Sequence, residues 1–205
     1  VKIGQSIDPL STKIEINTCD FVLDNSNGVE YSFKKRQPIL VYFNEELKST
    51  TFVNTAKRTS QNLWRITSED YISVLENVIF VGGIYKDKNA VELMQEIFEI
   101  AHTPFTISSN FENATVTGYI PYTSCREALM QVAFAIGAVV DTSNSSVVEV
   151  YALREEIKQK VPLNRIMQGQ NFRDKDPVTS VELTSHQYEI SDEETSVYDA
   201  TESGV

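Results

Sequence analysis

The chain has 205 residues, of which 41% are hydrophobic and 23% are charged, a composition typical of globular proteins and unlike that of disordered, collagen-like or membrane-spanning chains. No window approaches the roughly 20 consecutive apolar residues of a membrane helix, so we expect a soluble protein with no membrane span. The formal net charge is −11, and residues 176–205 hold eight acids and no base, which argues against nucleic-acid binding because that depends on Lys and Arg.

The first third of the sequence has the pattern of an antiparallel β-sheet. Short runs rich in β-branched and aromatic residues alternate with polar, turn-forming residues. In the last of these runs Trp64 and Ile66 alternate with Arg65, which predicts that the first two face the core. The four predicted strands are residues 13–23, 38–43, 50–56 and 63–67.

A short helix is predicted next, because apolar residues recur at helical spacing behind Ser68, Glu69 and Asp70, which offer a capping residue and acids suited to the helix dipole. The apolar positions are Tyr71, Val74, Leu75 and Val78. The glycine pair at residues 82–83 then predicts a turn. It is not a phosphate loop, since no lysine followed by Ser or Thr comes after it.

Residues 84–153 are predicted to form a small α/β unit with the order helix, two strands, helix, two strands. The first helix spans residues 90–102 behind a capping Asn89, and the second opens at Ser124 with a capping box completed by Glu127. Gly137 stands where a helix-ending glycine is expected. The strands are predicted at residues 105–108, 114–120, 138–140 and 147–153.

These changes of period predict an α+β fold with the order β, α/β, β. Residues 1–83 would be the first β part, residues 84–153 a small α/β domain, and residues 154–205 a return to β structure. In this last part, apolar and polar residues alternate and predict a strand over residues 178–190.

The sequence offers no recognisable centre for catalysis or metal binding. The two histidines, His102 and His186, stand in no zinc-binding spacing, and His102 is interpreted as a residue at the end of a helix. Cys19 and Cys125 are far apart and are expected to be buried free thiols. A Ser nucleophile elbow is missing. We therefore predict that the chain is not an enzyme and has no catalytic, cofactor-binding or metal-binding residues.

Acidic and aromatic groups are interpreted in the same way. Adjacent acids point apart on a strand or helix, so the pairs at 45–46, 69–70 and 155–156 are expected to be surface charge and not a glycosidase pair. Residues 192–194 lack the spacing and turn glycine of a calcium loop. Aromatic residues inside strand patterns are expected in the core and not on a sugar-binding face; they are Phe33, Tyr42, Phe43, Phe52 and Tyr119.

Seven segments, in a fixed order, carry a resemblance to a known family. They are IDPLSTKIEINTCDF at residues 7–21, FKKRQPI at 33–39, AKRT at 56–59, RITSED at 65–70, GYIP at 118–121, CREAL at 125–129 and AIGAVVD at 135–141. Together they resemble the N-terminal half of phage and prophage tail-hub or tail-tip proteins. The resemblance extends from residue 5 to residue 190. It implies an antiparallel β-barrel or tube-like domain interrupted by a small α/β domain. The first part of the barrel would lie in residues 1–83, the inserted α/β domain in residues 84–153, and the return to the barrel, cut short, in residues 154–205.

The resemblance implies a structural component of a phage-type tail tip or baseplate hub, forming a ring that joins the tail tube to the piercing or adsorption apparatus. It implies self-association, as a homotrimer in the intact protein, and contact with the tube, distal tail, tape-measure and tip proteins. The expected location is the virion tail, assembled in the bacterial cytoplasm, and an acidic lumen would let DNA pass without specific binding. No cofactor is implied. The residues leave open an alternative, a cell-wall or carbohydrate-binding module of a phage or surface protein.

Overall fold

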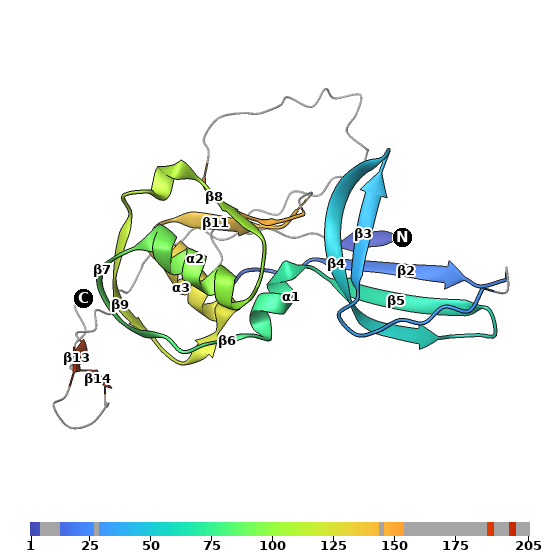
Figure 1. The fold of residues 1–205 in the computed structure, drawn as a ribbon, viewed down its shortest axis with the longest axis horizontal. Coiled ribbons are helices and arrows are strands. Elements are labelled where there is room, and N and C mark those ends of the chain that lie inside the picture. Colours follow the sequence, from blue (N-terminus) through green and yellow to red (C-terminus); the bar gives the residue numbers. More distant parts are fainter. Residues whose placement is uncertain (5–12, 27–28, 144–145, 154–187, 191–196, 200–205) are drawn as a thin grey trace, which may run out of the picture. The chain divides into compact units, whose positions relative to one another are not determined.

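The structure is a computed structural model, and it describes residues 1–4, 13–26, 29–143, 146–153, 188–190 and 197–199 (Figure 1). The chain divides into two compact units, Val1–Leu153 and Arg154–Val205. In the second unit, β13 (Tyr188–Ile190) pairs antiparallel with β14 (Val197–Asp199). The remainder of the strand predicted over residues 178–190, together with His186 and the acids at 155–156 and 192–194, lies outside the described residues. The three-part domain division stays a prediction.

Five strands of the first unit form an antiparallel sheet in the order β1-β2-β5-β4-β3. Strand β3 has the predicted bounds, β4 and β5 extend beyond theirs, and β1 was not predicted. The strands are β1 (Lys2–Gly4), β2 (Thr18–Asp24), β3 (Pro38–Phe43), β4 (Glu46–Arg58) and β5 (Leu63–Glu69).

The sheet is a curled half-barrel. In Figure 1, β4 is long and bends, so that it and β3 turn away from β2 and β5. The register of β4 shifts at Val53 to Thr55 opposite β5, and the register of β3 shifts at Val41 to Tyr42 opposite β4. Such bulges bend a strand and increase its twist, which accounts for the curl. The half-barrel confirms the expected antiparallel β architecture, while closure into a full barrel stays a prediction.

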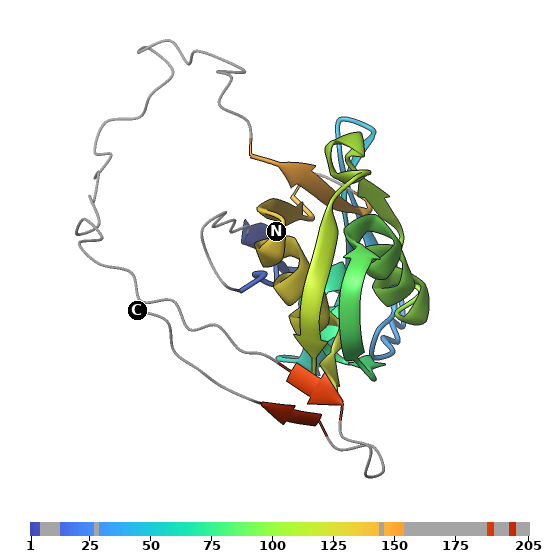
Figure 2. The same cartoon turned by 90° about the vertical axis from the view of Figure 1, so that its left-hand side faces the viewer.

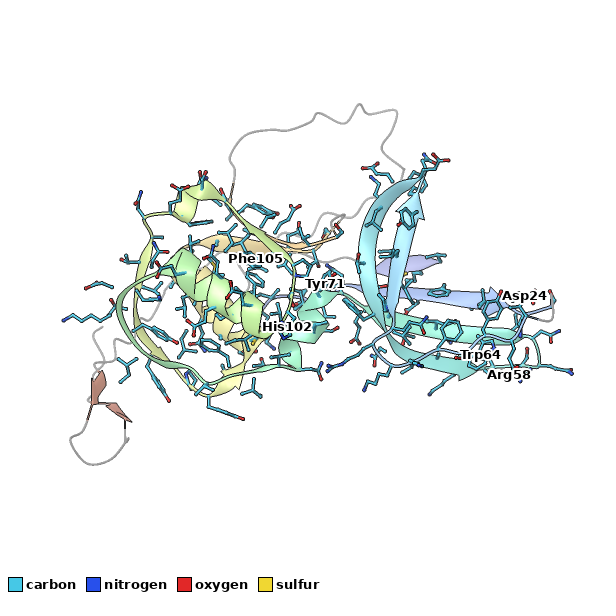
Figure 3. The ribbon with its side chains drawn as sticks, viewed as in Figure 1. Asp24, Arg58, Trp64, Tyr71, His102 and Phe105 are labelled. Atoms are coloured by element: carbon cyan, nitrogen blue, oxygen red, sulfur yellow. The ribbon has the colours of Figure 1, made fainter. Side chains whose placement is uncertain are left out.

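The inner face of the sheet follows the predicted alternation. Ile66 is fully buried and Trp64 is half-buried, with its ring centroid 5.7 Å from that of Phe33. On the opposite face, Arg65 lies directly across from Lys57 and both are exposed. Figure 3 shows Trp64 at one end of the sheet, with the residues of the helical part beginning beyond the other end. The prediction that Trp64 and Ile66 face inward is confirmed.

Residues 13–17 depart from the strand predicted over residues 13–23. Strand β2 begins only at Thr18. The preceding apolar side chains turn toward the helical core instead, where Ile14 is 9% exposed and Ile16 packs on the same cluster. The alternation of apolar and polar residues therefore marks buried positions correctly, but two different layers bury them. The strand prediction was wrong for this segment.

Three helices follow the sheet: α1 (Tyr71–Glu76), α2 (Ala90–Ile100) and α3 (Cys125–Ala135). The predicted caps of α2 and α3 are confirmed, whereas α1 is capped by Asp70 and has no acid in its first turn, contrary to the prediction. The Asn89 side chain accepts hydrogen bonds from the backbone N–H groups of Val91 and Glu92, and the Ser124 hydroxyl accepts one from that of Glu127. Gly137, just beyond α3, has a φ of 66°, the left-handed conformation typical of a helix-ending glycine.

The strands around these helices form two ribbons and a small mixed sheet. Strand β7 pairs with β9, and the two lie side by side in Figure 2; β6 pairs with β10; and β12 pairs antiparallel with β11 and parallel with β8. The bounds are β6 (Ile79–Phe80), β7 (Gly83–Asn89), β8 (Phe105–Ile107), β9 (Thr115–Ile120), β10 (Thr123–Ser124), β11 (Ala138–Asp141) and β12 (Val148–Ala152), with a 3-10 turn η1 (Ser109–Phe111).

The prediction for this region omitted β6, β7 and β10. Strand β7 follows the glycine pair directly and carries few apolar residues, so its sequence lacks a strand signature. The turn before it depends on Gly82, whose φ is 76° and where an added Cβ would lie 2.1 Å from the carbonyl oxygen of Ile120. Only glycine has room there.

The hydrophobic core lies between α2, α3 and the strands packed on them. Most apolar residues of α2 and α3 in this core are buried, whereas Val91 and Ile136 are only partly covered. Its fully buried side chains include Leu93, Met94, Ile97, Phe98, Leu129 and Val148. Each such side chain contributes roughly 1.5–3 kcal/mol by leaving water. No helix among the described residues is long and apolar enough to cross a membrane.

The two cysteines are buried free thiols, as predicted. Cys19 lies on the inner face of the sheet and Cys125 at the start of α3. Burial is the main cause that raises the pKa of both thiols. A raised pKa keeps the thiol protonated and unreactive at neutral pH.

A buried aspartate joins the sheet to the helical part of the unit. Asp70 lies between β5 and α1 and is 1% exposed. Its Oδ1 accepts a hydrogen bond from the backbone N–H of Ile72 at 3.0 Å, and its Oδ2 accepts one from the backbone N–H of Asn17 at 3.1 Å. The hydroxyl of Thr142, just after β11, also donates to Oδ2 and accepts a hydrogen bond from Nδ2 of Asn17 at 2.7 Å. Three separate segments are thus joined by mutually satisfied polar groups.

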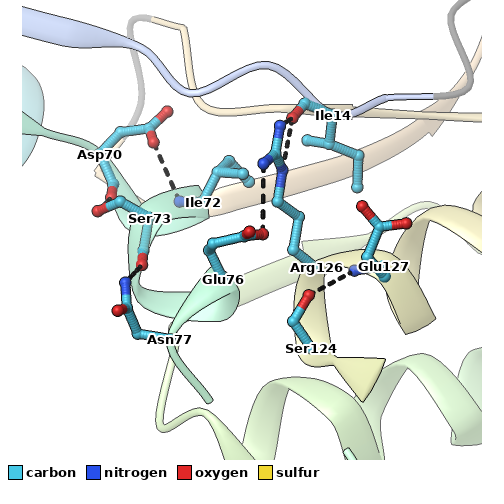
Figure 4. A network of polar contacts seen from close by, with 9 residues as sticks. All are labelled: Ile14, Asp70, Ile72, Ser73, Glu76, Asn77, Ser124, Arg126 and Glu127. Carbon is cyan, nitrogen blue, oxygen red and sulfur yellow. Dashed lines mark hydrogen bonds and ion pairs between the residues drawn. The ribbon is translucent and has the colours of Figure 1, made fainter. Parts of the chain in front are cut away.

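Arg126 of α3 makes a second link to the same N-terminal segment (Figure 4). Its Nε donates to the carbonyl oxygen of Ile14 at 2.8 Å, and its Nη2 donates to the same oxygen. Its Nη1 lies 3.3 Å from Oε2 of Glu76 at the end of α1. The Arg126 side chain is only 17% exposed, so losing these partners would leave a mostly buried charge unpaired.

The burial of Asp70 predicts a pH dependence of stability. Desolvation raises the pKa of Asp70 and outweighs the hydrogen bonds from Thr142, Asn17 and Ile72, which lower it. The folded protein therefore holds this proton more tightly than the unfolded chain. The resulting stabilisation is fully present below the unfolded pKa of about 4 and is lost as pH rises through the higher folded pKa.

Urea unfolding across this pH range should show the free energy of unfolding of the wild-type protein falling, relative to that of Asp70→Asn, as pH rises. Other carboxyl groups are common to both proteins and cancel in the difference. The control is Val139→Ala, a buried position on β11, whose difference from wild type should not change with pH. A flat or rising difference for Asp70→Asn would refute the assignment.

Candidate assembly surface

Among the described residues, those considered for catalysis from the sequence do not converge on one site. His102 follows α2 with a φ of 51°, and its backbone N–H donates to the carbonyl oxygen of Glu99 at 3.1 Å, so its interpretation as a helix-end residue is confirmed. The expectation that the acids at 69–70 are surface charge was wrong for Asp70, which is buried in the junction, whereas Glu69 accepts a hydrogen bond from Asn54. Among the described residues, no three or more His, Cys, Asp or Glu side chains gather closely enough to hold a metal ion.

The turn between β3 and β4 holds the acid pair at residues 45–46. Asn44 and Glu45 form a two-residue loop with φ values of 49° and 66°, the backbone combination of a tight hairpin. Glu46 then pairs with Lys48 at 2.8 Å and remains exposed. The pair is therefore turn and surface charge.

A groove lies at the opening of the curled sheet. Among the described strands, β1 and β3 are the two edges of the half-barrel. Side chains from both edges, together with Lys48 and Ser49 of β4, line one groove of about 620 Å³, so the curl brings the two edges to opposite sides of it. We call the apolar residues of this groove the seam patch: Val1, Ile3, Val41, Tyr42 and Phe43.

The seam patch is open to solvent. The exposed fractions are 90% for Val1, 45% for Ile3, 58% for Tyr42 and 65% for Phe43. Contiguous exposed apolar side chains of this kind mark surfaces that bind another molecule. The edges beside them also present backbone N–H and C=O groups that can pair with an added strand. The arrangement is suited to binding another molecule.

The expectation that the strand aromatics lie in the core was wrong for Tyr42 and Phe43. Both are largely exposed, whereas Phe33, Phe52 and Tyr119 are half-buried. Tyr42 and Phe43 follow the bulge in β3 and end the strand at its turn. At this position on an edge strand, no described neighbour covers them. The turn signal directly after Phe43 was the one sequence feature that could have indicated this.

Two solved structures share this fold. A 43 kDa tail protein of prophage MuSo2 from Shewanella oneidensis superposes with a TM-score of 0.51 and 9% sequence identity, over 67% of this chain and 46% of that one. A tail protein from Neisseria meningitidis MC58 superposes with a TM-score of 0.54 and 12% identity, over 66% of this chain and 41% of that one. This chain therefore spans less than half the length of either protein.

At such low identity the likeness is one of fold, and it confirms that the chain has a fold found in phage tail proteins. No protein-family model and no curated protein sequence matches the chain. The resemblance of sequence segments to tail proteins is thus supported by structure at the level of the tail-protein fold, without distinguishing a hub from other tail parts.

The exposure of the seam patch predicts that it adds little to the stability of the monomer. Tyr42→Ser and Phe43→Ser should each change the free energy of unfolding by less than about 1 kcal/mol. Ile66→Ala, at a fully buried position of the same sheet, should cost about 2–5 kcal/mol. Urea unfolding at low protein concentration measures all three. A cost for Phe43→Ser as large as that for Ile66→Ala would mean that Phe43 belongs to the core.

Proposed function

We propose that the chain is a structural component of a phage-type tail tip or baseplate hub, where copies of it form a ring that joins the tail tube to the piercing or adsorption apparatus. The observation that carries this proposal is the fold shared with two phage tail proteins. Fold alone does not define function, so the proposal also draws on the surface that the fold leaves open. Its expected location is the virion tail, after assembly in the bacterial cytoplasm.

The seam patch supports the proposal of a ring, because a ring subunit needs an exposed surface for its neighbour. A half-barrel with two open edges and exposed Tyr42 and Phe43 has a surface that a neighbouring subunit can cover. Rings arise when each copy presents two different surfaces that fit one another. We propose a homotrimer for the intact protein, with further contacts to the tube, distal tail, tape-measure and tip proteins.

We also propose that the chain has no catalytic role. Asp70 is the acid with the most strongly altered environment among the described residues, since it is buried and its pKa is raised, and such groups are often catalytic. Here its two oxygens accept hydrogen bonds from Asn17, Ile72 and Thr142, which gives them a structural use. The net charge of −11 suits a passage along which DNA moves without being bound.

Light scattering on a size-exclusion column tests the proposal. The mass of the 205-residue chain, and of any longer form that the gene encodes, should rise with concentration to that of a trimer or a larger ring. Tyr42→Ser with Phe43→Ser should shift the mass toward the monomer, while Lys57→Ser, on the outer face of the sheet, should not. A strict monomer for every form at all concentrations would remove the main structural expectation of the proposal.

The alternative, a cell-wall or carbohydrate-binding module, has one observation in its favour. Tyr42 and Phe43 are exposed neighbours at the rim of a groove, and aromatic rings in such positions can stack on sugars. Retention of the wild-type chain on insoluble peptidoglycan, lost in Tyr42→Ser with Phe43→Ser and accompanied by a monomeric mass, would favour this alternative over the ring.

A further inference from the structure

A second exposed apolar surface lies on the paired strands β6 and β10. Phe80 is 2% exposed and faces the core, whereas its neighbours on either side, Ile79 and Val81, are 46% and 75% exposed. Tyr122, which precedes β10, is 71% exposed. We call Ile79, Val81 and Tyr122 the ribbon patch.

The register of the ribbon holds these three side chains together. Thr123 pairs with Phe80 and Ser124 with Ile79, so Tyr122 comes next in line opposite Val81. The following turn is fixed because Gly82 packs directly against the backbone of Ile120 and Pro121. The backbone pairing therefore places the three side chains of the ribbon patch next to one another on one surface.

The two patches lie in parts of the chain that differ in charge, one nearly neutral and the other strongly acidic. Residues 1–69, which contain the seam patch, hold nine bases against eight acids, a net charge of +1. Residues 70–153, which contain the ribbon patch, hold three bases against ten acids, a net charge of −7. Charges of this kind act at a distance and orient two molecules as they meet.

We infer that the seam patch of one copy binds the ribbon patch of a second copy, in a head-to-tail contact repeated around the assembly. The inference rests on the proposed function, because it names the partner and the two faces of the proposed ring. The occupant of the seam groove is therefore the ribbon patch of a neighbouring copy, with Val81 and Tyr122 at the end of the paired strands β6 and β10.

Charge and symmetry favour this pairing over a contact between like patches. Two ribbon patches facing each other would bring together two parts that each carry −7, and like charges across an interface are unfavourable. Two seam patches facing each other would leave both ribbon patches exposed and would close a dimer. As a single type of contact, only the mixed one covers both apolar patches in every copy and can extend to a ring.

Mixing two defective variants tests the inference. The seam variant carries Tyr42→Asp and Phe43→Asp, and the ribbon variant carries Val81→Asp and Tyr122→Asp. Each alone keeps one working patch, so its apparent dissociation constant for self-association should rise at least about 30-fold, as for loss of an interface hot spot. A one-to-one mixture should then form a complex of one chain of each kind, because the working patches complement one another.

Native mass spectrometry of differently tagged variants measures this pairing, and unfolding curves check that each variant is folded. If an aspartate variant does not fold, the corresponding serine substitutions replace it. Self-association of the ribbon variant at wild-type strength would show a seam-to-seam contact and overturn the inference. So would an assembled wild-type protein whose defective variants do not combine. A monomeric wild-type protein would instead remove the proposed ring and the inference with it.

Discussion

The network around Asp70 is the constraint on which the first unit depends. A carboxylate that is 1% exposed is unfavourable unless its oxygens are satisfied, and the donors come from Asn17, Ile72 and Thr142. These residues precede β2, begin α1 and follow β11. Since each donor must be in place to offset the burial of the acid, the sheet, the first helix and the mixed sheet are held in a defined mutual arrangement. Arg126 reinforces this through Ile14 and Glu76.

Features of this fold that depend on neighbouring residues in the sequence can be predicted, whereas features that depend on residues far apart in the sequence cannot. The caps at Asn89 and Ser124 and the helix end at Gly137 are local and were predicted correctly. Strand β7 was not, because its register depends on β9, some thirty residues away, and its own composition is polar. The Asp70 network could not be predicted, since Asp70 and Asn17 are 53 positions apart and Asn17 and Thr142 are 125 apart.

The candidate assembly surface shows the same limit. Tyr42 and Phe43 have the composition of core residues, and only the curl of the sheet and the bulge in β3 show that they are exposed. Exposure is a property of the whole sheet, because a side chain at a sheet edge is covered only if another strand lies beside it.

The hydrogen bonds that hold residues 13–17 affect the order in which the protein folds during synthesis. Its partners are Arg126, 112 positions from Ile14, and Thr142, 125 positions from Asn17. Contacts between such distant positions form slowly because a long loop must first be closed. On the ribosome, the N-terminal sheet is complete in sequence long before α3 and the end of β11 emerge. The nascent sheet must therefore form without the hydrogen bond from Thr142 to Asp70, and this network can close only after Thr142 has left the exit tunnel.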